Sequence, residues 1–210
     1  MLKLKVCGMK FPKNILALIE LKPDYMGFIF YPKSKRYMAA SLNASFIKQI
    51  PESIKKVGVF VNDSLESIQF EVTRNNLNFV QLHGNETPEH CVSLNTKGIH
   101  VIKAFQVYPG FDFSLLKPYN ESCDYYLFDT QTHLYGGSGN KFDWNILKNY
   151  NNEKPFFLSG GIDLEDVDKI FNINDLNIHA IDINSCFELS PGLKDIEKVK
   201  SFQKLLNLAV

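Results

Sequence analysis

Short apolar segments alternate with longer amphipathic ones along the whole chain, and this alternation restricts the possible folds more than any other feature of the sequence. When each strand is followed by a helix, the strands pair in parallel, because the helix returns the chain to the end where the strand began. The predicted strands span 2–7, 25–30, 56–61, 79–82, 100–105, 125–129, 155–159 and 178–184. The predicted helices span 13–21, 39–50, 64–75, 87–96, 112–118, 143–150, 164–171 and 194–208.

Eight strand–helix units in 210 residues fit a closed barrel near its lower size limit. We therefore expect an α/β protein, a single-domain (β/α)8 TIM barrel that occupies residues 1–210. An open doubly wound sheet is the alternative, although such sheets usually contain fewer strands. Helix start signals agree with the alternation, since Ser64 precedes Leu65, Thr87 precedes Pro88 and Asp163 begins another predicted helix.

Charge and cysteine usage exclude several classes of function. The 23 basic residues equal the 23 acidic ones, so the chain lacks the positive charge that binds nucleic acid or an anionic membrane. No apolar run is long enough to cross a bilayer. The four cysteines are widely spaced and form no C-x-x-C pair, which argues against a zinc site and a disulfide framework. We expect a cytoplasmic protein without a metal.

Polar side chains end several predicted strands, at the rim where barrels of this class carry out their chemistry. Cys7 ends the first strand and Asp129 ends the sixth. Alone, each has an ordinary structural explanation, since a lone cysteine is often a core residue and an aspartate after a strand often caps a turn. Together they place a thiol and a carboxyl group on one rim, where they can act as base and acid.

A second set of polar residues lies one layer below this rim. Residues two apart in a strand share a face, so Lys5 points inward beneath Cys7, and Gln81 shares a face with His83. Charged residues are seldom buried without a partner. The first and eighth strands are neighbours in a closed barrel, and we expect Lys5 and Asp182 to lie within about 8 Å of each other. His83 is interpreted as a structural, hydrogen-bonded histidine.

Three glycine- or serine-rich stretches follow late strands: GGSG at 136–139, SGG at 159–161 and NSC at 184–186. Successive backbone N–H groups in such turns bind anions, and barrels often hold a phosphate in the loops after strands seven and eight. Arg36, after the second strand, is a candidate for binding a carboxylate with its forked guanidinium. The long connection 130–143 lies at the same rim and is expected to be functional.

An ordered set of short motifs resembles one enzyme family. The motifs are KVCGMK at 5–10, SKR at 34–36, QLHG at 81–84, LFDT at 127–130, GGSGNKFDW at 136–144, LSGGI at 158–162, IDINS at 181–185 and PGLKD at 191–195. Together they resemble the phosphoribosylanthranilate isomerases of tryptophan biosynthesis, from about residue 3 to residue 195. Each motif is modestly specific, but the complete set in this order is highly specific.

The resemblance implies a cofactor-free barrel that catalyses an Amadori rearrangement, in which N-(5-phosphoribosyl)anthranilate becomes 1-(2-carboxyphenylamino)-1-deoxyribulose 5-phosphate. It implies that Cys7 is the general base and Asp129 the general acid. It further implies that Arg36, Asp182, Gly137 and Ser138 bind substrate, and that Gly160, Gly161, Ser185 and Cys186 bind its phosphate. The expected partner is a small phosphorylated molecule, and the expected assembly is a monomer or a homodimer.

This chemistry requires protonation states that are unusual at neutral pH. Cys7 must be ionised and Asp129 protonated, whereas their ordinary pKa values favour the opposite. We expect Lys5, beneath the thiol, to lower the pKa of Cys7. Cys186 departs from the family pattern, because many members have glycine there, and a side chain restricts the backbone of this phosphate loop.

Other function classes remain possible from the residues alone. Metal-dependent sugar-phosphate epimerases need His and Asp ligands on several strand ends, and His83 is the only histidine that closes a predicted strand. Histidine-pathway isomerases use an aspartate at the end of the first strand, where this chain has Cys7. A non-catalytic phosphate sensor on the same scaffold would need Arg36 and the glycine loops, but neither Cys7 nor Asp129.

Overall fold

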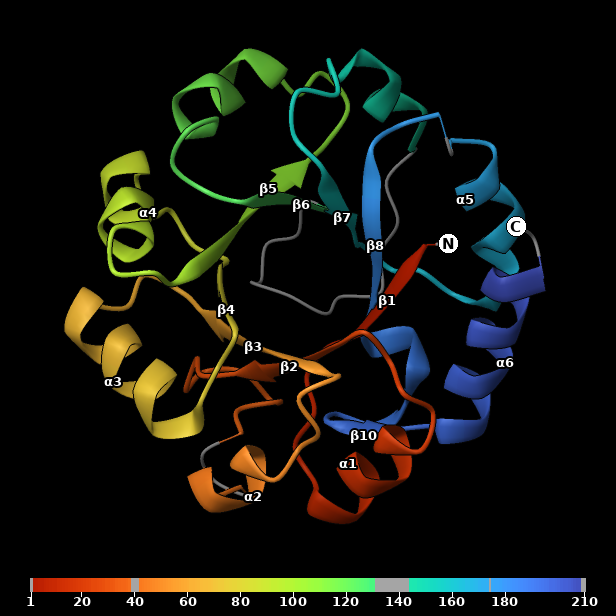
Figure 1. Ribbon diagram of the computed structural model, residues 1–210. Helices are drawn as coiled ribbons and strands as arrows, with labels where there is room; N and C mark the ends of the chain where they lie inside the picture. Colours follow the sequence, from red (N-terminus) through yellow and green to blue (C-terminus); the bar gives the residue numbers. More distant parts are fainter. Residues whose placement is uncertain (1, 39–41, 131–143, 174, 209–210) are drawn as a thin grey trace.

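A closed barrel of eight parallel strands forms the centre of the computed structural model, which describes residues 2–38, 42–130, 144–173 and 175–208. The strands are β1 (Lys3–Val6), β2 (Tyr25–Ile29), β3 (Lys55–Phe60), β4 (Phe79–Leu82), β5 (His100–Val107), β6 (Tyr125–Thr130), β7 (Phe156–Leu158) and β8 (Ile178–Ile183). The ring closes because β1 pairs with both β2 and β8. Helices surround it, as the view along the barrel shows (Figure 1). The predicted (β/α)8 barrel is confirmed, with strand ends within two residues of those predicted.

The helices match the predicted ones in order but not always in type. The α-helices are α1 (Pro12–Ile19), α2 (Ala44–Lys48), α3 (Leu65–Asn75), α4 (Pro88–Asn95), α5 (Val167–Phe171) and α6 (Ile196–Leu208). The segments 112–118 and 143–150 were expected to be regular helices and form 3-10 helices instead, η1 (Phe113–Tyr119) and η2 (Trp144–Asn149). Pro118 lies inside η1 and has no N–H for an α-helical bond. A further 3-10 turn, η3 (Leu164–Asp166), precedes α5.

The predicted helix start signals act as caps. Ser64 accepts a hydrogen bond from the Ser67 N–H at the start of α3, and Thr87 caps α4 in the same way. Asp163 and Asp166 form a reciprocal capping box at η3, in which each carboxylate accepts a hydrogen bond from the backbone N–H of the other residue. These bonds satisfy N–H groups that have no partner within the helix itself.

A small antiparallel hairpin follows β8 and was not predicted. The turn η4 (Ser185–Phe187) leads into β9 (Glu188–Ser190), which pairs with β10 (Leu193–Lys194). Strands this short carry too few residues for a periodic pattern to be recognised. The expected start of the last helix at residue 194 is wrong, because Lys194 lies in β10 opposite Glu188 and α6 begins at Ile196.

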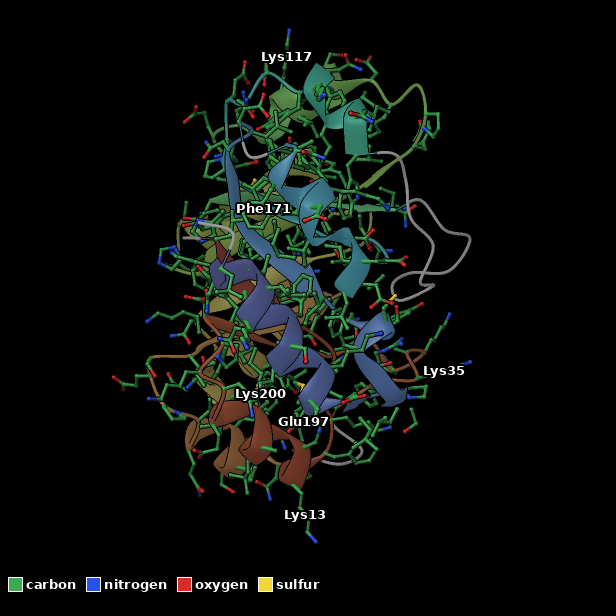
Figure 2. The ribbon with its side chains drawn as sticks, turned by 90° about the vertical axis from the view of Figure 1, so that its right-hand side faces the viewer. Lys13, Lys35, Lys117, Phe171, Glu197 and Lys200 are labelled. Carbon is green, nitrogen blue, oxygen red and sulfur yellow. The ribbon has the colours of Figure 1, made fainter. Side chains whose placement is uncertain are left out.

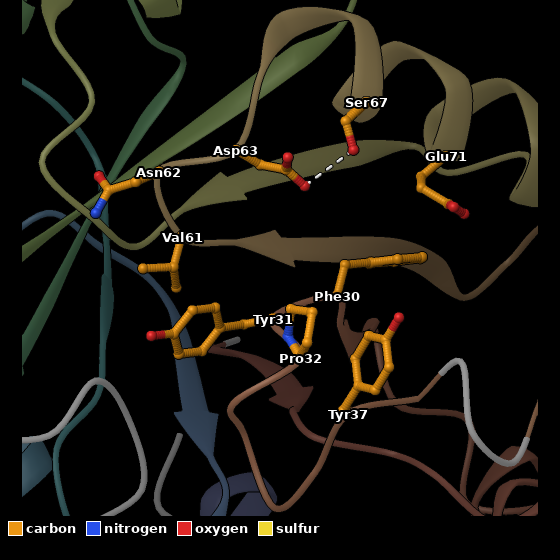
Figure 3. A pocket seen from close by; sticks show the side chains of 9 residues that line it. All are labelled: Phe30, Tyr31, Pro32, Tyr37, Val61, Asn62, Asp63, Ser67 and Glu71. Carbon is orange, nitrogen blue, oxygen red and sulfur yellow. Dashed lines mark hydrogen bonds between the residues drawn. The ribbon is translucent and has the colours of Figure 1, made fainter.

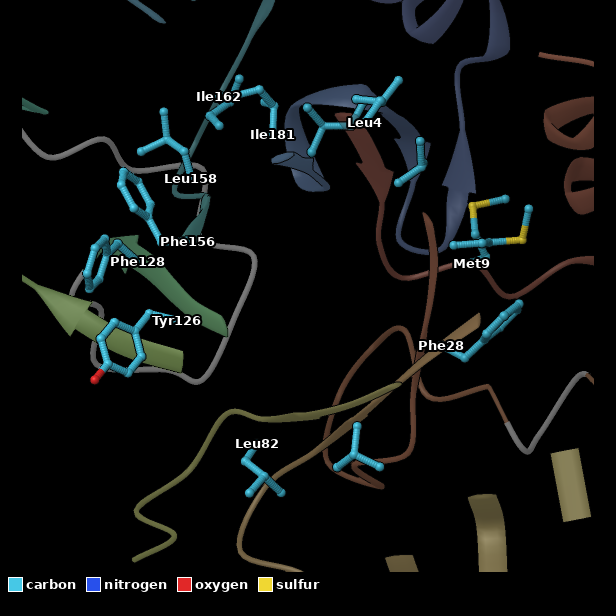
Figure 4. Close-up of a cluster of buried hydrophobic side chains, with 14 of the residues drawn as sticks. Leu4, Met9, Phe28, Leu82, Tyr126, Phe128, Phe156, Leu158, Ile162 and Ile181 are labelled. Atoms are coloured by element: carbon cyan, nitrogen blue, oxygen red, sulfur yellow. The ribbon is translucent and has the colours of Figure 1, made fainter. Parts of the chain in front are cut away.

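Alternate side chains of the strands point to two separate apolar layers. The layer inside the barrel consists of Tyr25, Val57, Ile102, Ala104, Leu127, Phe157 and Ala180. The larger layer lies between the strands and the surrounding helices, and Figure 4 shows part of it, including Leu4, Phe28, Phe128 and Phe156. Outside these layers, charged residues such as Lys13, Lys117 and Lys200 extend into solvent (Figure 2). The polar residues inside the barrel therefore stand out against an otherwise apolar interior.

Candidate active site

The backbone around Cys7 is fixed by the two strands that flank β1. The Cys7 N–H donates to the Ile183 carbonyl at 2.9 Å, and the next two N–H groups both donate to the Gly27 carbonyl at 3.0 Å. A Cβ atom at Gly27 would lie 2.7 Å from the Cys7 sulfur, so glycine in β2 provides the space for the thiol. Cys7 is buried at the carboxyl end of β1, where the sequence places it.

The predicted approach of Lys5 and Asp182 is confirmed. The Lys5 ammonium donates to Asp182 Oδ2 at 2.7 Å and to Gln81 Oε1 at 2.8 Å. Lys5 and Asp182 are opposite each other in the β1–β8 register, so the closure of the barrel creates the pair. All three side chains are buried, and an ion pair inside the barrel is stable only when such additional bonds accompany it.

The polar contacts continue from Gln81 to Asp129. Gln81 Nε2 donates to His83 Nδ1 at 2.8 Å, and His83 Nε2 lies 3.3 Å from Asp129 Oδ2. Lys5 fixes the orientation of the Gln81 amide, because the reversed amide would place its NH2 group against the ammonium donors. The amide in turn makes Nδ1 an acceptor, so that a neutral His83 carries its proton on Nε2, toward Asp129.

His83 is hydrogen-bonded, as the sequence analysis expected. The structure adds that its other ring nitrogen lies against the carboxyl group of the predicted acid. The signal that could have identified it is the alternation in QLHG, which places Gln81 and His83 on the same interior face as Lys5. The contacts join β1, β4, β6 and β8 across the mouth of the barrel.

The pKa of the Cys7 thiol is the net result of opposing effects in this interior layer. Burial raises the pKa of Cys7, and Lys5 beneath it offsets only part of this effect. Burial pulls the pKa of Lys5 down, but the Asp182 carboxylate and the thiol outweigh it, so the Lys5 pKa is raised. Burial likewise raises the pKa of Asp182 against the influence of Lys5. Lys5 thus acts on the thiol in the expected direction, but the effect of burial is larger and the net pKa of Cys7 is raised, since the thiolate shares its cation with Asp182.

Arg36 lies at the same rim but already has an acidic partner. Its Nε donates to both carboxylate oxygens of Glu188 at 2.9 and 3.0 Å, and its Nη2 donates to Oε2 at 2.6 Å. The Arg36 Cδ would lie 2.8 Å from a Cβ atom at Gly8, and Gly8 has a φ of +77°. Only glycine accommodates both this backbone and the arginine above it. Sequence reasoning missed Glu188, which lies in the unpredicted hairpin.

The two loops with predicted phosphate donors lie side by side. Gly160 and Gly161 have consecutive positive φ angles of +99° and +66° after β7. The Cys186 sulfur is 3.5 Å from the Gly161 carbonyl, and Lys198 donates to the Cys186 carbonyl while it pairs with Asp163 at 2.8 Å. Cys186 lies in η4, a 3-10 turn whose backbone conformation residues with side chains adopt readily. Ser185 begins the same turn.

Two predicted substrate residues, Gly137 and Ser138, fall outside the described residues, as does most of the connection 130–143. Among the residues that the structure describes, no cluster of three or more His, Cys, Asp or Glu side chains could hold a metal ion. The helices in the same part of the chain include none long and apolar enough to cross a membrane.

A pocket of about 350 Å³ opens beyond β2 and β3 (Figure 3). The described residues that line it are Phe30, Tyr31, Pro32, Tyr37, Val61, Asn62, Asp63, Ser67 and Glu71. Asp63 accepts a hydrogen bond from the Ser67 hydroxyl within it at 3.0 Å. Neither Cys7 nor Asp129 is among these nine residues, so this pocket is not the space between the thiol and the carboxyl group.

Known proteins similar to this chain identify its family. A sequence profile described as N-(5'phosphoribosyl)anthranilate (PRA) isomerase matches residues 4–205, nearly the whole chain. The chain belongs to this family. The N-(5'-phosphoribosyl)anthranilate isomerase of Parabacteroides distasonis is 46% identical over 211 aligned residues, which cover 99% of this chain and 95% of the relative. The corresponding protein of Phocaeicola vulgatus is 42% identical and covers 95% of both chains.

Solved structures of PRA isomerases have the same barrel. The enzyme from Thermotoga maritima is 36% identical, with a TM-score of 0.85 over 99% of both chains. A PRA isomerase in complex with reduced 1-(o-carboxyphenylamino)-1-deoxyribulose 5-phosphate is 33% identical, with a TM-score of 0.82 over 99% of both chains. Another structure is of monomers generated from the dimeric T. maritima enzyme. The resemblance found in the motifs is thus confirmed.

Proposed function

We propose that this chain catalyses the Amadori rearrangement of N-(5-phosphoribosyl)anthranilate, with Cys7 as general base and Asp129 as general acid. Membership of the PRA isomerase family makes it an aldose–ketose isomerase of tryptophan biosynthesis. The observation that supports the assignment of roles is the set of contacts that begins at Lys5, two residues before Cys7, and continues through Gln81 and His83 to Asp129.

The first step opens the ribose ring. Protonated Asp129 donates its proton to the ring oxygen, the bond between that oxygen and C1 breaks, and the nitrogen lone pair forms a C1=N Schiff base. The His83 Nε2–H, on the same side as Asp129, stabilises the carboxylate that remains. This step requires only a carboxyl group that reaches the ring oxygen, which a residue at the end of β6 can supply.

The second step forms the ketone. The Cys7 thiolate removes the proton from C2, and the electrons of that bond form the C1=C2 bond of an enolamine while the Schiff-base nitrogen regains its lone pair. Tautomerisation then moves the proton of the C2 hydroxyl to C1 and leaves the C2 ketone. The Lys5 ammonium beneath the sulfur stabilises the thiolate that this step consumes.

The reactive protonation state is a minor one in the unliganded protein. Burial raises the pKa of Cys7, so the thiol is neutral before substrate binds. The competent state moves one proton from Cys7 to Asp129 by exchange with solvent and leaves the total charge unchanged. Only this state carries the reaction forward, and substrate raises its population to the extent that it binds this state more tightly than the resting one.

The substrate's two ends would be held by different parts of the rim. Backbone donors at Gly160, Gly161, Ser185 and Cys186 would bind the phosphate, supported by the contact between their two loops. Arg36 would bind the aromatic carboxylate. Asp182 would orient Lys5, and through it the interior layer, since its carboxylate accepts from that ammonium.

The acid–base assignment is tested by turnover, followed as the loss of substrate fluorescence. Cys7→Ser and Asp129→Asn are each expected to lower kcat by about 100-fold or more. Cys123→Ser is the matched control, because Cys123 precedes β6 at the opposite end of the barrel from Asp129. Turnover that survives both rim substitutions would eliminate the proposed roles of the two residues.

The compartment and assembly remain predictions. The four cysteines are all free thiols, which is compatible with the expected cytoplasmic location. A monomer and a homodimer are both compatible with the relatives described above.

A further inference from the structure

A second buried cluster of charges lies beside the thiol, and the acid–base steps do not use it. It consists of Arg36, Glu188 and Lys194, with side chains that are 11%, 4% and 0% exposed. Glu188 and Lys194 face each other across the β9–β10 hairpin, while Arg36 comes from the segment after β2. Lys194 is buried and the side chains of Arg36 and Glu188 are largely so, and such charges need a reason because their removal from water costs free energy.

Glu188 occupies one edge of the Arg36 guanidinium. A guanidinium has five N–H groups and two edges that can each hold a carboxylate in a bidentate arrangement. The bonds to Glu188 use Nε and one N–H of Nη2. Within the described part of the chain, Nη1 makes no hydrogen bond. The Nη1–Nη2 edge therefore keeps the geometry needed for a second carboxylate.

Lys194 determines the net charge of the cluster. Its ammonium donates to Glu188 Oε1 at 2.7 Å, to Asn184 Oδ1 at 2.7 Å and to the Asn184 carbonyl at 3.1 Å, so all three N–H groups are used. With Arg36 and Lys194 charged and Glu188 ionised, the cluster carries one net positive charge. Without Lys194, Glu188 would neutralise the arginine completely.

Hydrogen bonds also fix the backbone of Lys194. The Lys194 N–H donates to Asn14 Oδ1 at 2.7 Å, and Asn14 Nδ2 donates back to the Lys194 carbonyl at 2.9 Å. The turn of the hairpin adds a bond from the Gly192 N–H to Glu188 Oε1 at 3.0 Å. This network explains the motif PGLKD at 191–195, to which the acid–base mechanism gives no role.

The cluster also adjoins the reactive thiol. Arg36 lies over Gly8, the residue after Cys7, and Asn184 Oδ1 would be 2.8 Å from a Cβ atom there. Lys194 acts electrostatically on Cys7 and favours its ionised form. Burial lowers the pKa of Lys194 to about 8, while Glu188 keeps it from falling further.

We propose that Glu188 and Lys194 are positioning residues for recognition of the substrate's aromatic carboxylate. Glu188 holds one edge of Arg36 so that the Nη1–Nη2 edge receives the carboxylate, and Lys194 neutralises Glu188 so that the arginine keeps its charge for the substrate. The inference rests on the proposed function, in which Arg36 binds that carboxylate. It makes the carboxylate, rather than the aromatic ring alone, a requirement for binding.

The test compares two ligands that differ only in this carboxylate. One is reduced 1-(2-carboxyphenylamino)-1-deoxyribulose 5-phosphate, and the other is its phenylamino analogue without the carboxylate. In the wild type, loss of the carboxylate should weaken binding by about tenfold or more. In Arg36→Met, Glu188→Gln and Lys194→Met this difference should shrink to about twofold, and KM should rise. The value of kcat should change little in Arg36→Met and Glu188→Gln, and it should fall in Lys194→Met, because the Cys7 thiolate also loses the influence of that ammonium.

The two-ligand design separates recognition from folding. A variant that is merely misfolded loses affinity for both ligands alike, whereas retained binding of the phenylamino analogue shows an intact barrel. Lys200→Met is the matched control, since Lys200 lies exposed on α6 (Figure 2), and it should behave as the wild type.

The outcomes distinguish the inference from the function on which it rests. If Arg36→Met retains the full carboxylate preference, the proposed role of Arg36 fails. If Arg36→Met abolishes the preference while Glu188→Gln and Lys194→Met retain it, the role of Arg36 stands and the positioning role of Glu188 and Lys194 is overturned.

Discussion

The pair formed by Lys5 and Asp182 allows the most direct test of the interior layer. Lys5→Met removes the ammonium but keeps a side chain of similar length. Asp182 would then remain buried without its cation, and Gln81 Oε1 would lose its donor. The strand register places Lys5 opposite Asp182, so the substitution removes the cation that closure of the barrel pairs with this carboxylate.

The size of the effect follows from the geometry. At 2.7 Å and an effective dielectric constant of about 20, the attraction between the two charges is about 6 kcal/mol. Part of this offsets the cost of burying both ions, so removing one partner should destabilise the protein by about 3–5 kcal/mol at neutral pH. Lys5→Met combined with Asp182→Asn should be about 2 kcal/mol more stable than the single variant, since no buried charge remains.

Urea unfolding measures these free energies, and its pH dependence provides a second readout. In Lys5→Met, Asp182 is buried without a cation, so its pKa is higher in the folded state than in the unfolded state. As the pH falls, the folded state therefore binds a proton on Asp182 before the unfolded state does. The loss of stability should therefore shrink as the pH falls from about 7 to about 5. In the wild type the ammonium remains in place over this range, because the pKa of Lys5 is raised.

The same variant tests the electrostatic support of the thiol. Without Lys5 the pKa of Cys7 should rise further. The pH profiles of the Cys7 alkylation rate and of kcat should therefore both shift to higher pH. The measurement needs a Cys186→Ala background, because Cys186 is a partly exposed second thiol at the same rim. A loss of stability below about 1 kcal/mol, or no gain from the added Asp182→Asn, would refute the reasoning about a coupled buried pair.

Three further predictions concern other parts of the barrel. His83→Asn should lower kcat by about 10- to 100-fold with little change in KM, since His83 acts on Asp129 rather than on substrate binding; steady-state kinetics measure both. Burial lowers the pKa of His179 to about 4, so acidification from about pH 7 to about 4.5 should destabilise the wild type by about 1–2 kcal/mol more than His179→Gln, measured by urea unfolding. Gly161→Ala should cost about 1–2 kcal/mol and raise KM, because its φ of +66° is strained for a side chain.

Each of these predictions has a clear contrary result. A change in KM alone for His83→Asn would assign that residue to binding. An equal acid sensitivity of the wild type and His179→Gln would mean that another group governs stability in this range. An unchanged stability for Gly161→Ala would show that the loop relaxes without strain.

The sequence by itself determined the architecture, because the pattern that specifies it is local and repeated. Each strand and its following helix can be recognised from a few residues, and their alternation leaves little choice other than a parallel barrel. The same periodicity placed Cys7 and Asp129 at strand ends and Lys5 opposite Asp182. The 3-10 helices and the β9–β10 hairpin escaped prediction because segments this short carry almost no periodic signal.

Only the tertiary structure decided which polar groups touch. The contacts from His83 to Asp129 and from Glu188 to Arg36 join residues 46 and 152 positions apart, and no local pattern encodes them. The tertiary structure also decided the environment of the thiol. The sequence indicated a cation beneath Cys7, but not how completely burial would remove the sulfur from water. Local spacing fixes where a side chain begins, whereas its partner and its dielectric surroundings arise only when distant strands close into a ring.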